Sequence, residues 1–315
     1  MIMYVSRMID RRLRVLAAIA RHGTVTAAAE VFRMTPSSAS HQMKALAREL
    51  GVTLLEPEGR GVRLTAAART LLVHGEILTA HWERARAELA AHRGGDVSGT
   101  LRFCGFSTAA AAVVPEVIGR LRGMHPALRL HLRECEPARA FDLLAAGDTD
   151  IVVVVATSSI PPVSDSAFDQ RTLFDEPLDV LVGPDHPLVG REDVALSDLA
   201  ADPWICSNPG RAYHQLVTLA CSSAGFAPDI AHYADEWDTG AALVSRGFGV
   251  ALVPRLADLP ARHDTRRLRI SAPPVPIRRV LAGVRAGAQY QPTIATGLDV
   301  LRDVCRLLSD RLATT

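Results

Sequence analysis

Long apolar runs are missing from this sequence of 315 residues. No stretch approaches the roughly 18 consecutive apolar residues that a membrane-spanning helix needs. The first residues, MIMYVSRMIDRRLRVL, lack the apolar core and the small-residue cleavage site of a secretory signal. The composition, 48% hydrophobic and 22% charged, is typical of globular domains. We therefore expect a cytoplasmic protein with no membrane partner.

Cysteine is also scarce, and no two cysteines have CxxC spacing. The sequence has five: Cys104, Cys135, Cys206, Cys221 and Cys305. An odd number of scattered cysteines is typical of reduced, buried thiols, so we expect neither a disulfide framework nor a zinc site. A redox-sensing pair of Cys206 and Cys221 is a narrower alternative, which requires Cα atoms within about 7 Å of each other.

The common catalytic motifs are absent as well. The sequence contains no GxSxG, HExxH or GxxxxGK[ST] motif, and no GxGxxG after a predicted strand. The eleven histidines do not pair with carboxylates at metal-ligand spacing, and His186 lies in GPDHPL, a sequence typical of a turn. We therefore predict no catalytic residue, no metal and no cofactor, although an enzyme remains the rival class.

The net charge is +1, but the charged residues are unevenly distributed along the chain. Residues 1–65 contain ten Lys and Arg against five Asp and Glu, whereas the remaining 250 residues contain 25 against 29. A basic segment of this kind fits attraction to phosphates, although many solvated surfaces are basic too.

One segment of the basic region, TPSSASHQMKALARELG, reads as a helix with two different faces. Thr35 suits the N-cap and Pro36 the first helical position. The apolar residues Ala39, Met43, Leu46 and Leu50 recur at steps of four, three and four, which places them on one stripe. The opposite face is polar and basic and carries no carboxylate. A solvated surface helix is the alternative interpretation.

The neighbouring segments favour a nucleic-acid interface. DRRLRVLAAIARHG predicts a helix that ends at Gly23, and TVTAAAEVF predicts a short second helix close to the first. A tight turn then leads to the helix at 36–50, as in a helix-turn-helix that inserts its second helix into the major groove. LLEPEGRGVRLT predicts two short strands around Gly59-Arg60-Gly61, which form a wing.

Together, GTVTAAAEVFRMTPSSASHQMKALARELG and LLEPEGRGVRLTAAART resemble the N-terminal domain of LysR-type transcriptional regulators, and the resemblance continues through essentially the whole chain. It implies that the hydroxyl-rich end of the helix at 36–50 faces double-stranded DNA. The residues expected to contact DNA are Thr24, Thr26, Thr35, Ser37, Ser38, Ser40, His41, Gln42, Lys44, Arg48, Arg60 and Arg63.

A long helix is predicted from Thr65 to about His92. Leu71, Gly75, Leu78, Trp82, Ala85 and Leu89 recur at alternating steps of four and three, a heptad seam that indicates dimerisation. Packing of the helix onto its own chain is the alternative. In the LysR family this linker helix pairs with that of a second chain, so we expect a homodimer or homotetramer. Its dimerisation residues are expected to be Leu71, Leu78, Trp82, Ala85 and Leu89.

Beyond HRGGDVSG the pattern changes to alternating strands and helices, typical of a mainly parallel sheet. Helices are predicted over 108–125 and around ALSDLAA, and DIVVVVA predicts a buried strand. The overall expectation is α/β, with an all-α winged helix-turn-helix N-terminal domain, a linker helix and a two-lobed α/β effector domain resembling type 2 periplasmic binding proteins. The predicted boundaries are 8–64 for the DNA-binding domain, 65–94 for the linker, 95–312 for the effector domain, 98–160 with 277–312 for lobe one, and 167–270 for lobe two.

Small ligands bind at the carboxyl ends of parallel strands, which here lead into loops rich in hydroxyls. Helix N-termini attract anions, and Arg211 can add a bidentate contact, so the effector is expected to be a small molecule and could be a carboxylate. The expected contacts, partly implied by the resemblance, are Ser107, Thr108, Ser207, Asn208, Arg211, Trp237 and Thr239. Capping of their own helices is the alternative role for these residues, and Glu134 and Glu136 either line the rim or face solvent.

Besides the enzyme, two function classes are considered. The first is a sequence-specific DNA-binding transcriptional regulator controlled by a small effector. The second is a bare solute-binding module, which the two lobes resemble but which the basic N-terminal part and the missing secretory signal disfavour.

Overall fold

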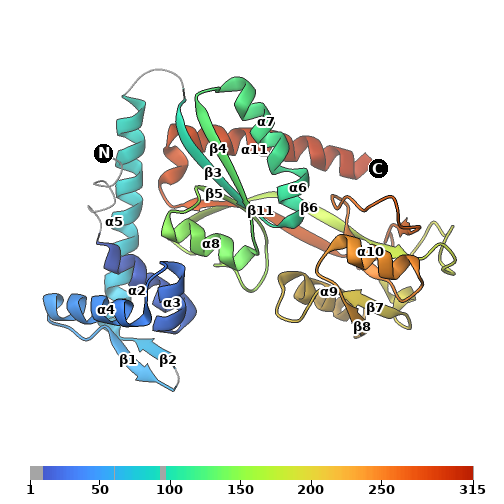
Figure 1. Ribbon diagram of the computed structural model, residues 1–315, viewed down its shortest axis with the longest axis horizontal. Helices are drawn as coiled ribbons and strands as arrows, with labels where there is room; N and C mark the ends of the chain where they lie inside the picture. Colours follow the sequence, from blue (N-terminus) through green and yellow to red (C-terminus); the bar gives the residue numbers. More distant parts are fainter. Residues whose placement is uncertain (1–9, 60, 93–96, 315) are drawn as a thin grey trace.

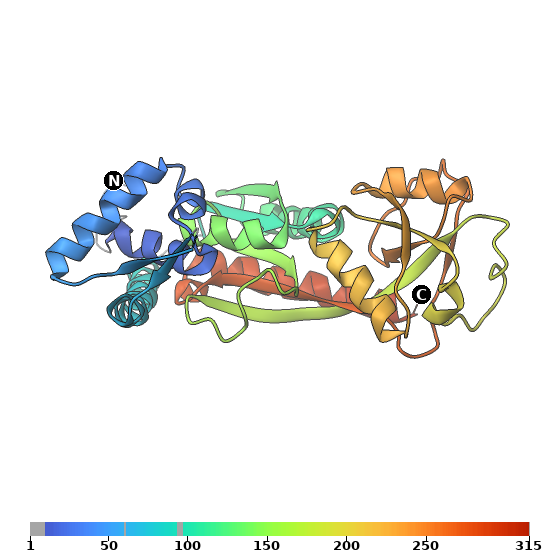
Figure 2. The same ribbon diagram turned by 90° about the horizontal axis from the view of Figure 1, so that it is seen from below.

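The computed structural model describes residues 10–59, 61–92 and 97–314. Figures 1 and 2 show the N-terminal domain at one end of an elongated molecule, a first lobe in the middle and a second lobe at the other end. Among the residues described, no helix is long and apolar enough to cross a bilayer.

The N-terminal domain consists of three helices and a hairpin: α2 (Arg11–His22), α3 (Val25–Val31), α4 (Pro36–Leu50), β1 (Leu55–Glu58) and β2 (Gly61–Leu64). Local signals fix the helix ends. The side chains of Thr24 and Thr35 accept a backbone N–H from the first turns of α3 and α4, and Gly23 and Gly51 end α2 and α4 with φ of 71° and 67°. The predicted helix-turn-helix and wing are confirmed.

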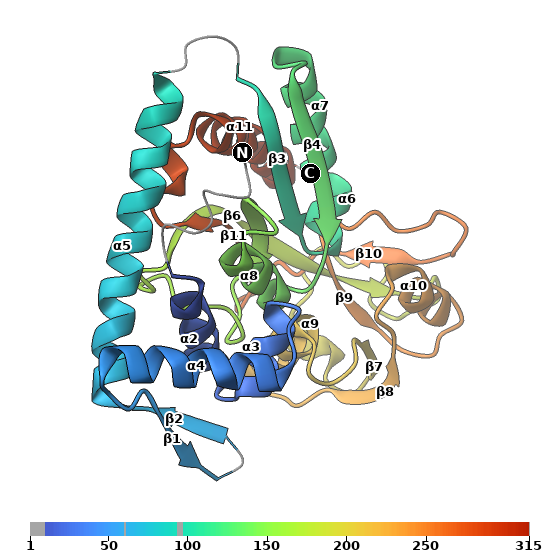
Figure 3. The same ribbon diagram turned by 60° about the vertical axis from the view of Figure 1, so that its left-hand side comes forward.

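The long helix α5 (Ala66–Ala91) follows directly, as predicted. Thr65 caps it by accepting the N–H of Ala68 at 3.1 Å. Where α5 crosses α2, a Cβ on Gly75 would lie 3.4 Å from Cδ1 of Leu13, so the glycine permits close packing of the two helices. Figure 3 shows α5 running from the N-terminal domain along the side of the first lobe.

Lobe one is a sheet covered by helices on both faces. Its first elements are β3 (Gly99–Gly105), α6 (Ser107–Ala112), α7 (Val114–Met124), β4 (Leu128–Glu134), α8 (Pro137–Ala146) and β5 (Ile151–Val155). The chain returns to this lobe at its end with β11 (Ile277–Arg285), η2 (Ala288–Tyr290) and α11 (Pro292–Thr314). Helices α7 and α11 bury their apolar residues on one face and α8 on the other.

The single helix predicted over 108–125 was wrong, because the chain breaks it at Val113 into α6 and α7. Pro115 lies in the first turn of α7. Proline lacks an N–H and is tolerated in a first turn but not in a helix interior, so a second helix begins at this point.

One strand, β6 (Phe168–Val182), passes through both lobes. With β9 (Ala251–Pro254) and β10 (Arg266–Leu268) from lobe two, the sheet order is β10-β6-β11-β5-β3-β4, and β9 also pairs with β6. Residues 168–177 of β6 pair with β11, and residues 178–182 pair with β9 and β10. The expected start of lobe two at 167 thus coincides with the start of a strand that first belongs to lobe one.

Lobe two contains η1 (Leu196–Leu199), β7 (Pro203–Cys206), α9 (Ala212–Ser223), β8 (Asp229–Tyr233), α10 (Trp237–Ser245), β9 (Ala251–Pro254) and β10 (Arg266–Leu268). The helix predicted at ALSDLAA is only the short 3-10 turn η1. It does not extend further, because Pro203 disfavours helical conformation at the preceding residue, Asp202. Strand β8 had no sequence signal, because its residues are exposed or half-buried and lack an apolar run.

Candidate DNA-binding and effector sites

The outward face of α4 presents the residues that the sequence assigned to DNA contact. Ser37, Ser38, His41, Lys44 and Arg48 are exposed, and Ser40 and Gln42 are half-buried at the edges of this face. The opposite stripe is buried by Ala39, Met43 and Leu46, all at most 3% exposed. Leu50, predicted to join the stripe, is 45% exposed, because the helix ends here beyond the helices it packs against.

Thr24 and Thr35 act as helix caps. Oγ1 of Thr24 accepts the N–H of Ala27 at 3.2 Å, and Oγ1 of Thr35 accepts the N–H of Ser38 at 3.1 Å. A hydroxyl that accepts an N–H still has its own proton, so both groups keep a donor for a phosphate. Thr26 is exposed on α3.

The wing carries a basic residue that is already paired. Arg63 of β2 donates to Glu56 at 2.6 Å and lies 3.6 Å from Glu58. Its charge is therefore partly compensated by the hairpin itself, and a phosphate would have to compete with Glu56. Arg60 lies outside the described residues.

The predicted seam of α5 is divided between two environments. Leu71 packs against the core of the N-terminal domain, Gly75 lies against α2, and Trp82 and Ala85 are half-buried. Leu78 and Leu89, by contrast, are 59% and 60% exposed. Leu78 and Leu89 share one side of α5, whereas the exposed Val73 and Ile77 lie about 100° or more around the helix from them. Leu78 and Leu89 thus have no apolar partner among the described residues.

A cavity of about 100 Å³ lies between the lobes. Five of the predicted effector residues line it: Ser107, Thr108, Ser207, Arg211 and Trp237. Asn208 and Thr239 are exposed and are not part of the lining. Asn208 instead holds Asp235 through its backbone N–H and its side-chain amide, and these bonds lower the pKa of Asp235.

Two hydroxyls from opposite lobes have no hydrogen-bond partner among the described residues. They are Oγ1 of Thr108, a residue that is 3% exposed, and Oγ of Ser207, a residue that is 7% exposed. Neither α6 nor α9 has a side-chain cap, so these residues do not cap their helices. A buried hydroxyl without a hydrogen-bond partner destabilises the folded protein. Both hydroxyls line the cavity, where a ligand could supply the missing partner.

Arg211 links the two lobes. It is the N-cap residue of α9 in lobe two, and its Nη1 lies 3.1 Å from Glu136, the residue that precedes α8 in lobe one. Its Nε also lies 3.4 Å from Asp235. The guanidinium of Arg211, which we expected to bind a ligand carboxylate, thus contacts two carboxylates of the protein itself. Of the two uncertain glutamates, Glu136 lines the cavity and Glu134 is exposed outside it.

Three further lining residues had no individual sequence signal. Arg278 of β11 forms a buried ion pair with Glu176, its register partner on β6, at 2.7 Å. The guanidinium also lies 4.9 Å from the ring centre of Phe106. Tyr213 donates to the carbonyl of Leu252 at 2.9 Å and meets Trp237 edge-on at 5.1 Å, and burial raises the pKa of its hydroxyl.

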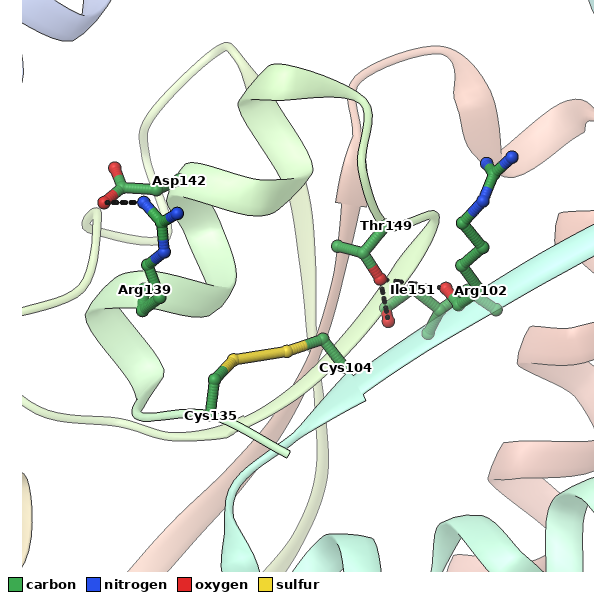
Figure 4. Close-up of a disulfide and its surroundings, with 7 residues drawn as sticks. All are labelled: Arg102, Cys104, Cys135, Arg139, Asp142, Thr149 and Ile151. Carbon is green, nitrogen blue, oxygen red and sulfur yellow. Dashed lines mark hydrogen bonds and ion pairs between the residues drawn. A yellow bond between two sulfur atoms is a disulfide. The ribbon is translucent and has the colours of Figure 1, made fainter. Parts of the chain in front are cut away.

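The expectation that all cysteines are reduced was wrong for one pair. Cys104 at the end of β3 and Cys135 just after β4 form a disulfide, with Cα atoms 6.7 Å apart (Figure 4). Neighbouring parallel strands bring residues 31 positions apart together, which spacing alone does not reveal. The bond joins the two strand ends that lead into the cavity loops at Phe106 and Glu136.

The alternative pair, Cys206 and Cys221, consists of free, buried thiols. Burial raises the pKa of Cys206 to about 11 and of Cys221 to about 12, which keeps both protonated at neutral pH. This environment favours inert core residues over a redox pair.

Comparisons with known proteins agree with this arrangement. Residues 11–69 match the family model of the bacterial regulatory helix-turn-helix protein, lysR family, and residues 94–306 match that of the LysR substrate binding domain. The DNA-binding transcriptional dual regulator OxyR of Escherichia coli is 30% identical over 259 residues, 80% of this chain and 81% of the relative. The regulator AlsR of Bacillus subtilis is 29% identical over 249 residues, 78% of this chain and 80% of the relative.

Solved structures show the same fold. An OxyR mutant of Corynebacterium glutamicum with bound hydrogen peroxide superposes with a TM-score of 0.62 at 24% identity, over 96% of each chain. The LysR family regulator CbnR superposes with a TM-score of 0.54 at 22% identity, over 92% of this chain and 99% of that one. The chain belongs to the LysR family of DNA-binding transcriptional regulators, and its C-terminal lobes are the effector-binding domain.

Proposed function

We propose that this regulator reads its operator with the exposed N-terminal face of α4, pairs with a second copy through α5, and responds to a small effector bound between the lobes. The observation that carries the proposal is the hydroxyl-rich, acid-free face of α4, which is exposed. The helix lies at the end of the molecule away from lobe two (Figure 1). Because its partner is DNA, we place the protein in the cytoplasm.

Base reading and phosphate contact predict different mutant behaviour on α4. Ser37→Ala or His41→Ala is expected to reduce discrimination between operator and random DNA by about tenfold, because base contacts carry sequence information. Lys44→Ala should weaken binding to both DNAs and lower the slope of affinity against salt by about one. The measurement is fluorescence anisotropy on the DNA upstream of the protein's own gene and on shuffled DNA, across a salt series.

Ser222→Ala, a change of one exposed serine on α9, is the matched control and should leave both affinities unchanged. Equal losses on operator and random DNA for Ser37→Ala and His41→Ala would show that these residues do not read bases.

The cavity between the lobes suits an effector that forms hydrogen bonds with Thr108 and Ser207 and has a carboxylate that pairs with Arg211. In the described structure Glu136 occupies that position on Arg211, so an effector carboxylate would replace Glu136. Replacement removes an ion pair between the lobes and thereby changes their preferred arrangement.

The test starts with a screen of small carboxylates for compounds that change operator affinity. Thr108→Val keeps the side-chain shape but removes the hydroxyl, and it should weaken the effector response about tenfold or more while operator binding without effector stays intact. Glu136→Gln should instead strengthen the response, because the competitor for Arg211 loses its charge. An unchanged response in both variants would exclude this mode of binding.

A further inference from the structure

A second, larger cavity lies where three parts of the chain meet: helix α2 of the DNA-binding domain, helix α5, and lobe one. Its volume of about 360 Å³ falls within the range of small-molecule sites, roughly 300–1,000 Å³. No residue lines both this cavity and the cavity between the lobes, so the two cavities are separate.

The walls of this junction cavity are held together by direct contacts between the parts. A Cβ on Gly287 of lobe one would lie 2.2 Å from the carbonyl oxygen of Ala80, which shows how closely α5 approaches. Glu83 of α5 accepts a bond from Arg285 at 3.4 Å and another from Gln291. On the side of the DNA-binding domain, His22 lies 2.8 Å from Asp142.

More arginines than carboxylates line the junction cavity. Five arginines line it (Arg14, Arg21, Arg86, Arg102 and Arg285) against three carboxylates (Glu76, Glu83 and Asp150). Arg86 and Arg285 share Glu83, whereas Arg102 and Arg285 share Asp150. Ser166 donates to Glu76. The carboxylates are therefore engaged with other groups.

Arg21 forms no ion pair within the part of the chain that the structure describes. Its Nη1 is buried and has no hydrogen-bond partner among the residues described, and its guanidinium lies 5.2 Å from the ring centre of Phe168. Burial lowers the pKa of Arg21, because a charge is removed from water, and the charges of Asp165, Asp142 and Glu76 offset only part of this effect. A buried cation with a spare donor is stabilised by an anion at that donor.

We infer that the junction cavity binds a small organic anion, with its charged group on Nη1 of Arg21 and its apolar part against Leu72, Trp82 and Phe168. This site is independent of the effector site proposed between the lobes. Its ligand class follows from the unsatisfied donor of Arg21 together with these apolar walls.

Such a ligand would contact α2 and lobe one at the same time. Its affinity would therefore depend on how the DNA-binding domain sits against lobe one. By thermodynamic linkage, binding of the anion would shift operator affinity by the same factor as DNA shifts affinity for the anion.

The three tryptophans allow each cavity to be observed separately. Trp82 lines the junction cavity, Trp237 lines the cavity between the lobes, and Trp204 is fully buried in lobe two. In the full chain, Trp237→Phe leaves Trp82 as the responsive reporter, whereas Trp82→Phe leaves Trp237. Cyclohexanecarboxylate is the probe, and cyclohexanecarboxamide is its uncharged counterpart.

Saturable change in the fluorescence of Trp82 on addition of the carboxylate is expected, with the carboxamide binding about tenfold or more weakly. Adding Arg21→Gln should weaken carboxylate binding by a similar factor, and Arg21→Lys, which keeps the charge, should retain most of it. Arg302→Gln on the exposed side of α11 is the matched control and should change nothing. Thermal unfolding of each variant verifies that it is folded.

Equal binding of carboxylate and carboxamide, or equal binding with and without Arg21→Gln in folded protein, would overturn the inference. A response confined to Trp237 would also overturn it, because the anion would then occupy the cavity between the lobes, and the proposed effector site would stand alone.

Discussion

Replacing Leu78 and Leu89 with aspartate is expected to convert the protein to a monomer and to lower operator affinity about 100-fold or more. Both leucines lie on the same side of α5, with exposed fractions of 59% and 60%. In the proposed dimer these two leucines are buried against a second copy, and carboxylates placed in such a seam would be desolvated and would repel each other. Loss of the dimer leaves one recognition helix per particle, so the second half-site no longer contributes to affinity.

Sedimentation velocity gives the oligomeric state, and anisotropy on operator DNA gives the affinity. Leu219→Asp, at a leucine 69% exposed on α9, is the matched control and should keep the assembly and the affinity of the unaltered protein. Because all three leucines are exposed in the protomer, circular dichroism should be unchanged. A double variant of α5 that remains dimeric would contradict the proposed interface.

Glu176→Gln is expected to lower the free energy of unfolding by about 3–5 kcal/mol. The carboxylate is fully buried and accepts bonds from Arg278 and from the backbone N–H of Leu256, each at 2.7 Å. The change leaves the guanidinium of Arg278 in a buried position without a compensating charge, which costs more than the pair itself contributes.

The adjacent register pair supplies a matched control for this prediction. Asp175 and Arg279 face each other on the same two strands, 2.8 Å apart, but their side chains are 39% and 55% exposed. The hydrogen bond from Arg279 lowers the pKa of Asp175, yet solvent screens exposed pairs, so Asp175→Asn should have little effect on stability. Urea unfolding measures both variants, and equal losses for the two would contradict the proposed role of burial.

The DNA-binding domain was predictable because its determinants are local. Thr35, Pro36 and Gly51 specify where α4 begins and ends, and the apolar stripe specifies which face is buried. The spacing that identified the outward face needs no knowledge of distant residues. Only Leu50 departed, because burial at a helix end depends on how far the neighbouring helices extend.

The remaining features depend on contacts between distant segments. The heptad pattern of α5 could not show that Gly75 packs within the protomer while Leu78 stays exposed, because that depends on the position of α2. The Cys104–Cys135 disulfide and the Glu176–Arg278 pair require knowledge of which strands are neighbours. The rule on strand ends pointed to Thr108 and Ser207, which line the cavity between the lobes, whereas the partners of Arg211 had no sequence signal.

The path of β6 has a consequence for dissecting the protein. Lobe two is a contiguous insertion, because the strand crosses into it at residue 178 and β11 returns to lobe one at Ile277. Lobe one, by contrast, needs two separate segments of the gene, and a fragment truncated near residue 165 would lack β6, β11 and α11 and expose an open edge of β5. Exchanging ligand specificity between relatives would therefore take a single transplanted cassette for lobe two but a paired transplant for lobe one.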